Sequence, residues 1–144
     1  MMDVLQQAGL PGLFFISFLA ATLLPLGSEI WLVTLQQQGF ASLDLLLVAG
    51  AGNTLGSCLN FALGWYAGSW LVVRYMGVSA QKLELAQHRL QKYGYGLLFF
   101  AWVPLIGDPL TFMAGILKLR FSLFLLLVAA GKLARYAVLL YLFV

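Results

Sequence analysis

The stretch Tyr93–Leu119 decides the fold, and it reads YGYGLLFFAWVPLIGDPLTFMAGILKL. Its apolar run is interrupted near the centre by Pro104, Gly107, Asp108 and Pro109. Each proline removes a backbone donor and clashes with the preceding turn, which disfavours one continuous helix. We therefore predict two half-helices that meet at a broken tip, where helix ends offer dipoles and unpaired backbone groups to ligands. A single spanning helix with a proline kink is the alternative.

The composition of the chain is that of a membrane protein. Of its 144 residues, 62% are hydrophobic and 9% are charged, and the mean hydropathy is +0.95. Ordinary soluble domains carry about 25% charged residues. The length suffices for about four segments of membrane depth, each of about 20 residues, with no room for a separate aqueous domain. We predict an all-α integral membrane protein with a single membrane domain over residues 1–144.

The few polar and special residues limit the partners of the chain. Met1, Met2 and Asp3 form no basic N-terminal region, so we expect the first apolar run to be retained rather than cleaved as a signal peptide. The net charge of +3 comes from clustered Lys and Arg, which indicates lipid headgroup contact rather than nucleic-acid binding. Cys58 is the single cysteine, so neither an internal disulfide nor a metal cluster is expected, and no cofactor is expected.

The first apolar run, from about residue 10 to residue 35, carries a similar interruption. Pro25, Gly27, Ser28 and Glu29 stand near its middle. A shift of 80 positions places Gly27 on Gly107, and it also aligns a leucine-rich run after residue 43 with one after residue 123. Both halves share one order of features, namely a broken hairpin, a short polar turn and a long apolar helix.

This shared order predicts two inverted repeats, each a re-entrant helical hairpin broken at Pro and Gly and followed by a long transmembrane helix. Repeat 1 covers about 10–75 and repeat 2 about 93–144. The hydrophilic segment 77–92 joins them as a cytoplasmic amphipathic helix, because four basic residues lie in or beside it: Arg74, Lys82, Arg89 and Lys92. Ser79 is its predicted N-cap, and His88 is interpreted as a solvated interfacial residue.

Small residues recur every four positions along the segment 43–75. They are Gly52, Gly56, Asn60, Gly64 and Gly68, with Asn53 beside them. Small-residue faces let helices approach closely in lipid, so we interpret this stripe as a helix-packing face, with a substrate groove as the alternative.

Four ionisable groups stand at predicted membrane depth: Glu29 and Asp108 at the two breaks, and Lys132 and Arg135 in the last apolar helix. Each cation costs about 2.5 to 3.5 kcal/mol at the bilayer centre on insertion scales, so each needs an anionic partner. The four charges could simply tie the repeats together. A buried ion pair is often no more stabilising than apolar residues of similar volume, so we favour a functional role.

At these residues the chain resembles the DedA family, also called the SNARE-associated or VTT-domain family, and most closely its short YqaA-type bacterial members. The resemblance covers nearly the whole length. It depends on four segments: Ala20–Glu29, Gly52–Gly56, Trp102–Pro104 with Gly107 and Asp108, and Gly131–Lys132 with Arg135 and Tyr136.

The resemblance implies two oppositely oriented re-entrant hairpins in the bacterial cytoplasmic (inner) membrane. It also implies lipid movement, since bacterial members are associated with flipping polyprenyl-phosphate carriers or other phospholipids, with proton coupling suggested. Glu29 matches the acidic residue of the first break, and Pro104 matches the proline of the second. Larger members carry arginines three residues before and after that proline, where this chain has Ala101 and Gly107.

Two functions follow from these observations. In the first, the chain is a transporter or flippase of an anionic lipid, in which Lys132 and Arg135 bind the phosphate while Glu29 and Asp108 exchange protons. Burial raises the pKa of a carboxyl group and a nearby cation lowers it, so a site with both can change protonation as its cation changes partner. In the second, the chain is a structural or assembly protein with purely internal charge pairs.

An enzyme is not expected. The sequence offers no Cys and His spacing for a metal, no Ser and His pair, and no cluster of several acids. A homo-oligomer is left open by the sequence.

Overall fold

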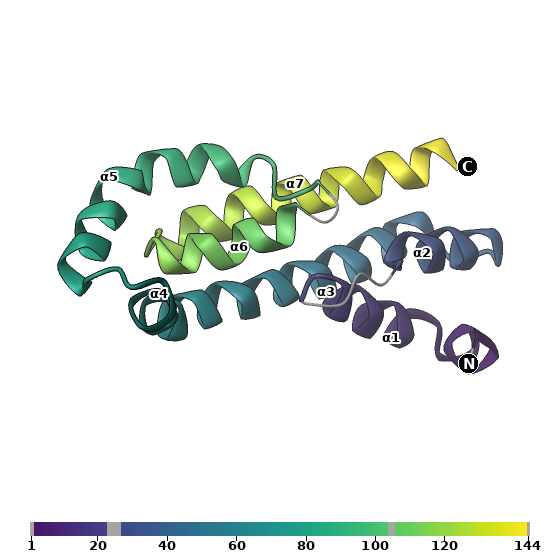
Figure 1. Ribbon diagram of the computed structural model, residues 1–144. Coiled ribbons are helices and arrows are strands. Elements are labelled where there is room, and N and C mark those ends of the chain that lie inside the picture. Colours follow the sequence, from purple (N-terminus) through teal and green to yellow (C-terminus); the bar gives the residue numbers. More distant parts are fainter. Residues whose placement is uncertain (1, 23–26, 104–105, 144) are drawn as a thin grey trace. The chain divides into compact units, whose positions relative to one another are not determined.

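The computed structural model describes residues 2–22, 27–103 and 106–143, and within these ranges every regular element is a helix. Pro25 and Pro104 lie outside the described residues. In chain order the elements are α1 (Met2–Ala20), α2 (Ser28–Gln37), α3 (Ser42–Leu63), the π-helix η1 (Gly64–Gly68), α4 (Ser69–Met76), α5 (Ala80–Leu98), α6 (Gly107–Ile116) and α7 (Phe121–Leu142) (Figure 1). The predicted all-α class is confirmed for the described ranges.

The chain forms two compact units. Unit 1 comprises Met1–Gly56 and Ala129–Val144, and unit 2 comprises Ser57–Val128. Each unit therefore takes residues from both halves of the sequence. The long helices α3 and α7 each have one part in unit 1 and the other part in unit 2.

Within the described ranges, two helical stretches are long and apolar enough to cross a membrane. They are Ser42–Met76, with 35 residues and a mean hydropathy of 1.3, and Phe121–Leu142, with 22 residues and a mean hydropathy of 1.9. By contrast, α2 and α6 have 10 residues each. At a rise of 1.5 Å per residue each is about 15 Å long, half of the hydrocarbon thickness of about 30 Å.

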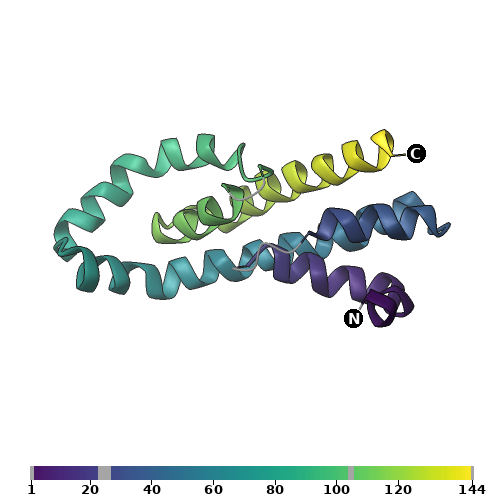
Figure 2. The same cartoon turned by 45° about the vertical axis from the view of Figure 1, so that its right-hand side comes forward.

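Each short helix packs against the helix that precedes it. In unit 1, α1 contacts α2, and in unit 2, α5 contacts α6 (Figures 1 and 2). The core of unit 1 consists of Leu13, Leu32, Leu35, Leu45, Ala49, Tyr136 and Leu140. The core of unit 2 consists of Phe61, Leu98, Ala101, Ala114, Leu119, Phe124 and Val128.

The order of the elements repeats along the chain. α2 and α6 each have 10 residues, and a long apolar helix follows each of them, Ser42–Met76 and Phe121–Leu142. Ser28 and Gly107, the first residues of the short helices, are 79 positions apart, and so are Ser42 and Phe121, the first residues of the long ones. The two halves of the structure therefore match in a register of 79 positions, one fewer than the shift of 80 inferred from the sequence. The sequence could not distinguish these shifts, because a leucine-rich run gives identities at several of them.

The ends of α2 and α6 have the same hydrogen-bonded cap. After α2, the backbone N–H of Gly39 donates to Gln36 O at 3.0 Å and that of Phe40 donates to Leu35 O at 3.2 Å. After α6, Lys118 donates to Gly115 O at 3.0 Å and Leu119 to Ala114 O at 3.2 Å. This is the Schellman pattern, which needs a left-handed residue after the helix. Gly39 (φ 96°) supplies it in the first case and Lys118 (φ 56°) in the second.

Three details differ from the sequence-based expectation. The segment 77–92 does not end before the hairpin, because α5 runs without a break from Ala80 to Leu98, with Ser79 as its N-cap (Lys82 N to Ser79 Oγ, 3.3 Å). Pro109 does not break a helix. It lies in the first turn of α6, where the missing N–H has no intrahelical partner to lose. Finally, α1 begins before residue 10 and bends at Gly9 (φ 56°).

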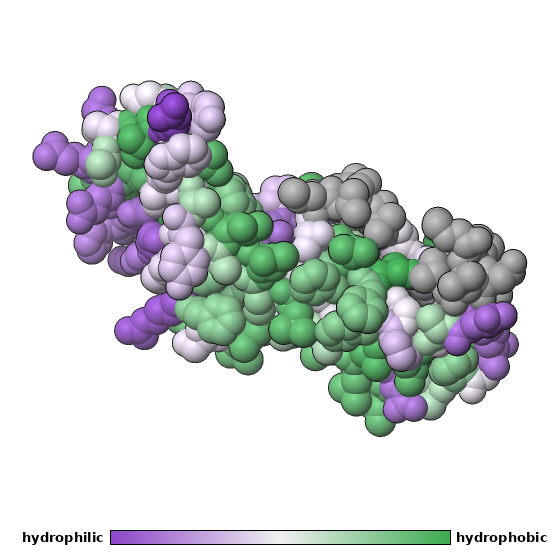
Figure 3. Space-filling view, turned by 90° about the horizontal axis from the view of Figure 1, so that it is seen from below, coloured by the Kyte–Doolittle hydropathy of each residue, from purple (hydrophilic) through white to green (hydrophobic). Residues whose placement is uncertain are grey.

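The polar and apolar surfaces are separated. Figure 3 shows hydrophilic side chains gathered at the α4–α5 end of unit 2, where Arg74, Lys82, Arg89 and Lys92 are exposed. Many large apolar side chains are also exposed, among them Ile30, Leu126 and Leu142. Apolar exposure on this scale is typical of a surface that faces lipid.

Candidate functional site

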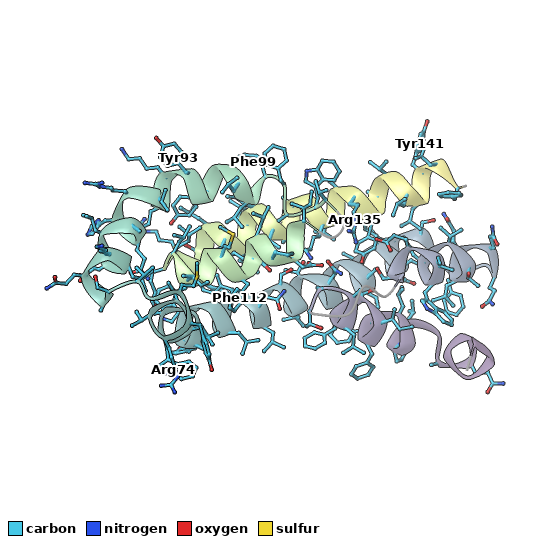
Figure 4. The ribbon with its side chains drawn as sticks, in the orientation of Figure 1. Arg74, Tyr93, Phe99, Phe112, Arg135 and Tyr141 are labelled. Atoms are coloured by element: carbon cyan, nitrogen blue, oxygen red, sulfur yellow. The ribbon has the colours of Figure 1, made fainter. Side chains whose placement is uncertain are left out.

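An ion pair in unit 1 joins the first break to the last helix. Arg135 Nη2 on α7 lies 3.1 Å from Glu29 Oε1 in the first turn of α2. The two side chains are 15% and 35% exposed, respectively, so the pair is partly accessible. Glu29 also lies where the positive end of the α2 dipole favours an anion. Figure 4 shows Arg135 directed from α7 toward α2.

The second cation of α7 is more deeply buried and has a neutral partner. Lys132 is 1% exposed, and its Nζ donates to Asn53 Oδ1 on α3. Asn53 Nδ2 in turn donates to the backbone oxygen of Ser17 on α1 at 2.9 Å. Three helices of unit 1 thus meet at one buried polar chain. The Oγ of Ser17 is buried there and has no hydrogen-bond partner among the described residues.

A second polar contact lies beside the ion pair. Ser28 Oγ and Tyr136 OH are 2.9 Å apart and buried, joining the residues next to Glu29 and Arg135. The guanidinium of Arg135 lies 4.8 Å from the centre of the Tyr136 ring. A planar cation over an aromatic face is held in one orientation by the ring, so Tyr136 helps to aim Arg135 toward α2.

The fourth predicted charge lies in unit 2. Asp108 is half-buried in the first turn of α6, and its backbone oxygen accepts a hydrogen bond from Thr111 Oγ1 at 2.6 Å. In the structural register of 79 positions, Asp108 corresponds to Glu29 and Lys132 corresponds to Asn53. The two acids therefore occupy the same place, the second residue of a 10-residue helix, in the two halves of the chain.

The small-residue stripe contacts backbone in both units. A Cβ added to Gly52 or Gly56 would lie less than 3.0 Å from the backbone oxygens of Phe14 or Phe18 on α1. A Cβ on Gly64 would meet Phe112 O of α6, and one on Gly68 would meet the Ile116 side chain. Asn60 Nδ2 lies 3.2 Å from Thr111 Oγ1 of α6. The stripe thus packs on α1 in unit 1 and on α6 in unit 2.

The sequence interpretation missed three contributors. Ser17 is the single hydroxyl of the apolar helix α1, and Ser28, which the sequence analysis named only as part of the first interruption, begins α2; their polarity was the available signal. The third contributor is Lys118. In the structure its Nζ donates to Trp65 O in the π-helix η1 and lies 4.5 Å from the centre of the Trp65 ring.

The chemistry of the site in unit 1 is that of charge pairing. The described residues contain no group of three or more His, Cys, Asp or Glu side chains that could hold a metal ion. What they offer is a guanidinium with two forked donors, a carboxylate able to take a proton, and a second cation three residues away.

The comparisons with known proteins cover nearly the whole chain. The VTT domain family model matches residues 10–144. The inner membrane protein YqaA of Escherichia coli is 34% identical over 132 residues, which is 91% of this chain and 88% of YqaA. An uncharacterised protein of Haemophilus influenzae is 32% identical over 148 aligned positions, covering 97% of this chain and 90% of that protein. Neither name states a catalytic activity. The comparison with solved structures gave no significant match.

Proposed function

The chain belongs to the VTT-domain (DedA) family, and from that premise we propose that it moves an anionic lipid, a polyprenyl phosphate or a phospholipid, across the bacterial inner membrane. It is a multi-pass protein of that membrane. The observation that carries the proposal is the partly accessible ion pair between Glu29 and Arg135, flanked by the buried Lys132. Two cations on one helix face suit a phosphate group, which carries more than one oxygen acceptor.

The proposed cycle exchanges partners at Arg135. A lipid phosphate approaches the exposed side of the pair and takes the two forked donors of Arg135. In this cycle Glu29 takes up a proton when it is released from its cation. When the lipid leaves, Arg135 returns to Glu29 and the proton is released. Lys132, held by Asn53, supplies the second positive charge throughout, and Asp108 is a second acid for proton exchange.

We also propose that α1–α2 and α5–α6 are re-entrant hairpins of two inverted repeats. Three features support this arrangement. α2 and α6 are each about half the length needed to span the hydrocarbon. Each packs along the preceding helix rather than extending it. Each ends in the same cap before a long apolar helix, Ser42–Met76 after α2 and Phe121–Leu142 after α6. Irregular backbone between such half-helices is tolerated where protein covers it.

The test is reconstitution of the purified protein in liposomes, with transfer of fluorescent phosphatidylglycerol or undecaprenyl phosphate between leaflets measured at several pH gradients. Wild-type protein should accelerate transfer, and the rate should depend on pH. Glu29→Gln keeps the size of the side chain and mimics the protonated state, so we expect a similar melting temperature and a rate that no longer responds to pH. Absence of transfer for every lipid and gradient would refute the proposal.

A structural or assembly protein is the second candidate, and the bond from the buried Lys132 to Asn53 favours it, since it ties α7 to α3 within unit 1. The exchanged pair Glu29→Arg with Arg135→Glu separates the two functions. A purely structural pair should regain stability and any cellular function on exchange. A phosphate site should not, because the cation has moved to a different helix.

A further inference from the structure

A groove in unit 2 is lined by none of the charged residues that form the site in unit 1. It is open, has a volume of about 290 Å³, and is lined by Cys58, Phe61, Ala62, Trp65, Tyr66 and Phe121. These residues come from the end of α3, from η1 and from the first turn of α7. The Phe61 ring packs against the rings of Trp65 and Phe121, and its centre lies 5.6 Å from each of theirs. Tyr66 is 84% exposed, so the groove opens to the surroundings of the protein.

Two basic residues lie next to this apolar groove. The ammonium of Lys118 lies 4.5 Å from the centre of the Trp65 ring and donates one hydrogen bond, to Trp65 O. An ammonium has three donors, so others remain for a ligand. Arg120 directly precedes Phe121 and is exposed, and the part of the chain that the structure describes gives its guanidinium no carboxylate partner.

The position of these residues along the chain gives their depth in the membrane. The stretch of α7 that is long and apolar enough to span begins at Phe121, and we therefore expect Arg120 and Lys118, which directly precede it, at the level of the headgroups. Basic residues at that level attract anionic headgroups, and tryptophan and tyrosine are enriched there.

We propose that the groove binds one acyl chain of an anionic phospholipid whose phosphate is held by Arg120 and Lys118. Apolar walls alone would accept the chain of any lipid. The adjacent pair of cations selects an anionic headgroup, because a zwitterionic headgroup brings its own cation to the same place. This bound lipid is distinct from the transported one, since its residues all belong to unit 2 and include neither Glu29 nor Arg135.

The experiment uses the full-length protein in phosphatidylcholine vesicles that contain a minor fraction of lipid with brominated acyl chains, either phosphatidylglycerol or phosphatidylcholine. Bromine quenches tryptophan fluorescence on close contact. The chain has four tryptophans, so the part of the fluorescence that is due to Trp65 is obtained as the difference between the wild type and Trp65→Phe. Brominated phosphatidylglycerol should quench this part at lower mole fraction than brominated phosphatidylcholine.

Arg120→Gln should raise about fivefold the mole fraction of brominated phosphatidylglycerol that is needed to quench Trp65. This is the usual effect of one basic residue near an anionic surface. Arg74→Gln is the matched control. Arg74 is also exposed and lies 5.6 Å from a tryptophan ring, that of Trp70, but it does not border the groove. It should leave the Trp65 signal unchanged.

Two results would overturn the inference. Equal quenching by the two lipids would mean that the groove meets hydrocarbon without recognising a headgroup. No quenching of Trp65 by either lipid would mean that another occupant, such as a second copy of the chain, covers the groove. Neither result bears on lipid movement at Glu29 and Arg135, which is measured separately by leaflet transfer.

Discussion

Lys132 and Arg135 are three residues apart on α7 but have different surroundings. Lys132 is almost fully buried and bonds to a neutral amide, whereas Arg135 is partly exposed and bonds to a carboxylate. A buried ammonium that loses its partner destabilises the fold, while a partly exposed guanidinium can change partners. We therefore propose that Lys132 mainly positions α7 against α3 and adds a positive charge to the site. Arg135 is the residue that we expect to contact the lipid phosphate.

Arg135→Lys keeps the positive charge and removes the planar fork. We expect the melting temperature to change little, because a single-point ion pair with Glu29 remains. Affinity for the lipid should fall about tenfold, the factor that corresponds to a loss of about 1.4 kcal/mol for one charge-assisted hydrogen bond. The measurement is the lipid concentration that gives half-maximal transfer in liposomes. Unchanged affinity together with a large loss of stability would show that Arg135 is only structural.

Asn53→Ala tests the buried polar chain. The substitution removes the acceptor that Lys132 contacts and the donor to Ser17 O, so we expect the free energy of unfolding to fall by about 1 to 3 kcal/mol. The measurement is thermal unfolding in detergent. Thr22→Ala removes an exposed bond, from Thr22 Oγ1 to Leu19 O, and should have an effect within about 0.5 kcal/mol. Equal effects of the two substitutions would contradict the assigned role of Asn53.

At the scale of the elements, glycines determine how closely helices approach. In unit 2, η1 and the end of α3 approach α6 closely. A Cβ on Gly64 would meet Phe112 O, and one on Gly115 would meet Phe61 O and Trp65 N. Backbone contacts of this kind cannot relax by a change of rotamer, so the whole helix would have to move. The π-helix begins at Gly64, and Lys118 bonds to the backbone oxygen of Trp65 inside it.

Gly64→Ala should therefore destabilise the protein by about 1 to 3 kcal/mol, the usual cost of overpacking. Gly96→Ala is the control, because Gly96 is also helical but nothing lies within 4 Å of its added Cβ. There the higher helix propensity of alanine should be neutral or stabilising by up to about 1 kcal/mol. Thermal unfolding of both variants decides the question, and a destabilisation shared by both would argue against close packing at Gly64.

At the scale of the whole molecule, the hairpin arrangement determines the topology. If both interrupted segments are re-entrant, residues 77–92 and 118–120 lie on the cytoplasmic side and both chain ends face the periplasm. If both segments span, both ends are cytoplasmic. We expect a periplasmic C-terminus.

Reporters fused to the C-terminus distinguish these topologies, since alkaline phosphatase is active only in the periplasm and green fluorescent protein folds only in the cytoplasm. High phosphatase activity and no fluorescence is the expected result. A second fusion after Lys92 should give the opposite signals in either arrangement and serves as the control. A fluorescent C-terminal fusion would contradict the re-entrant hairpins.

The sequence by itself determined the membrane class, the helical content, the Ser79 cap and the stretches in which helices are interrupted. These properties depend on composition and on local patterns of 3.6-residue periodicity, proline and glycine, which act within a few turns. It also identified Glu29, Lys132 and Arg135 as charges in need of partners, because a cation in an apolar helix is costly wherever it finally lies.

Only the tertiary structure decided which partners meet. Glu29 pairs with Arg135, and Lys132 donates a hydrogen bond to Asn53 of α3. It also set the register of 79 positions, through the caps at Gly39 and Lys118. The physical reason is that such pairings depend on the rotation and closeness of helices far apart in the chain. Those follow from packing of side chains and glycine contacts, which no local pattern encodes.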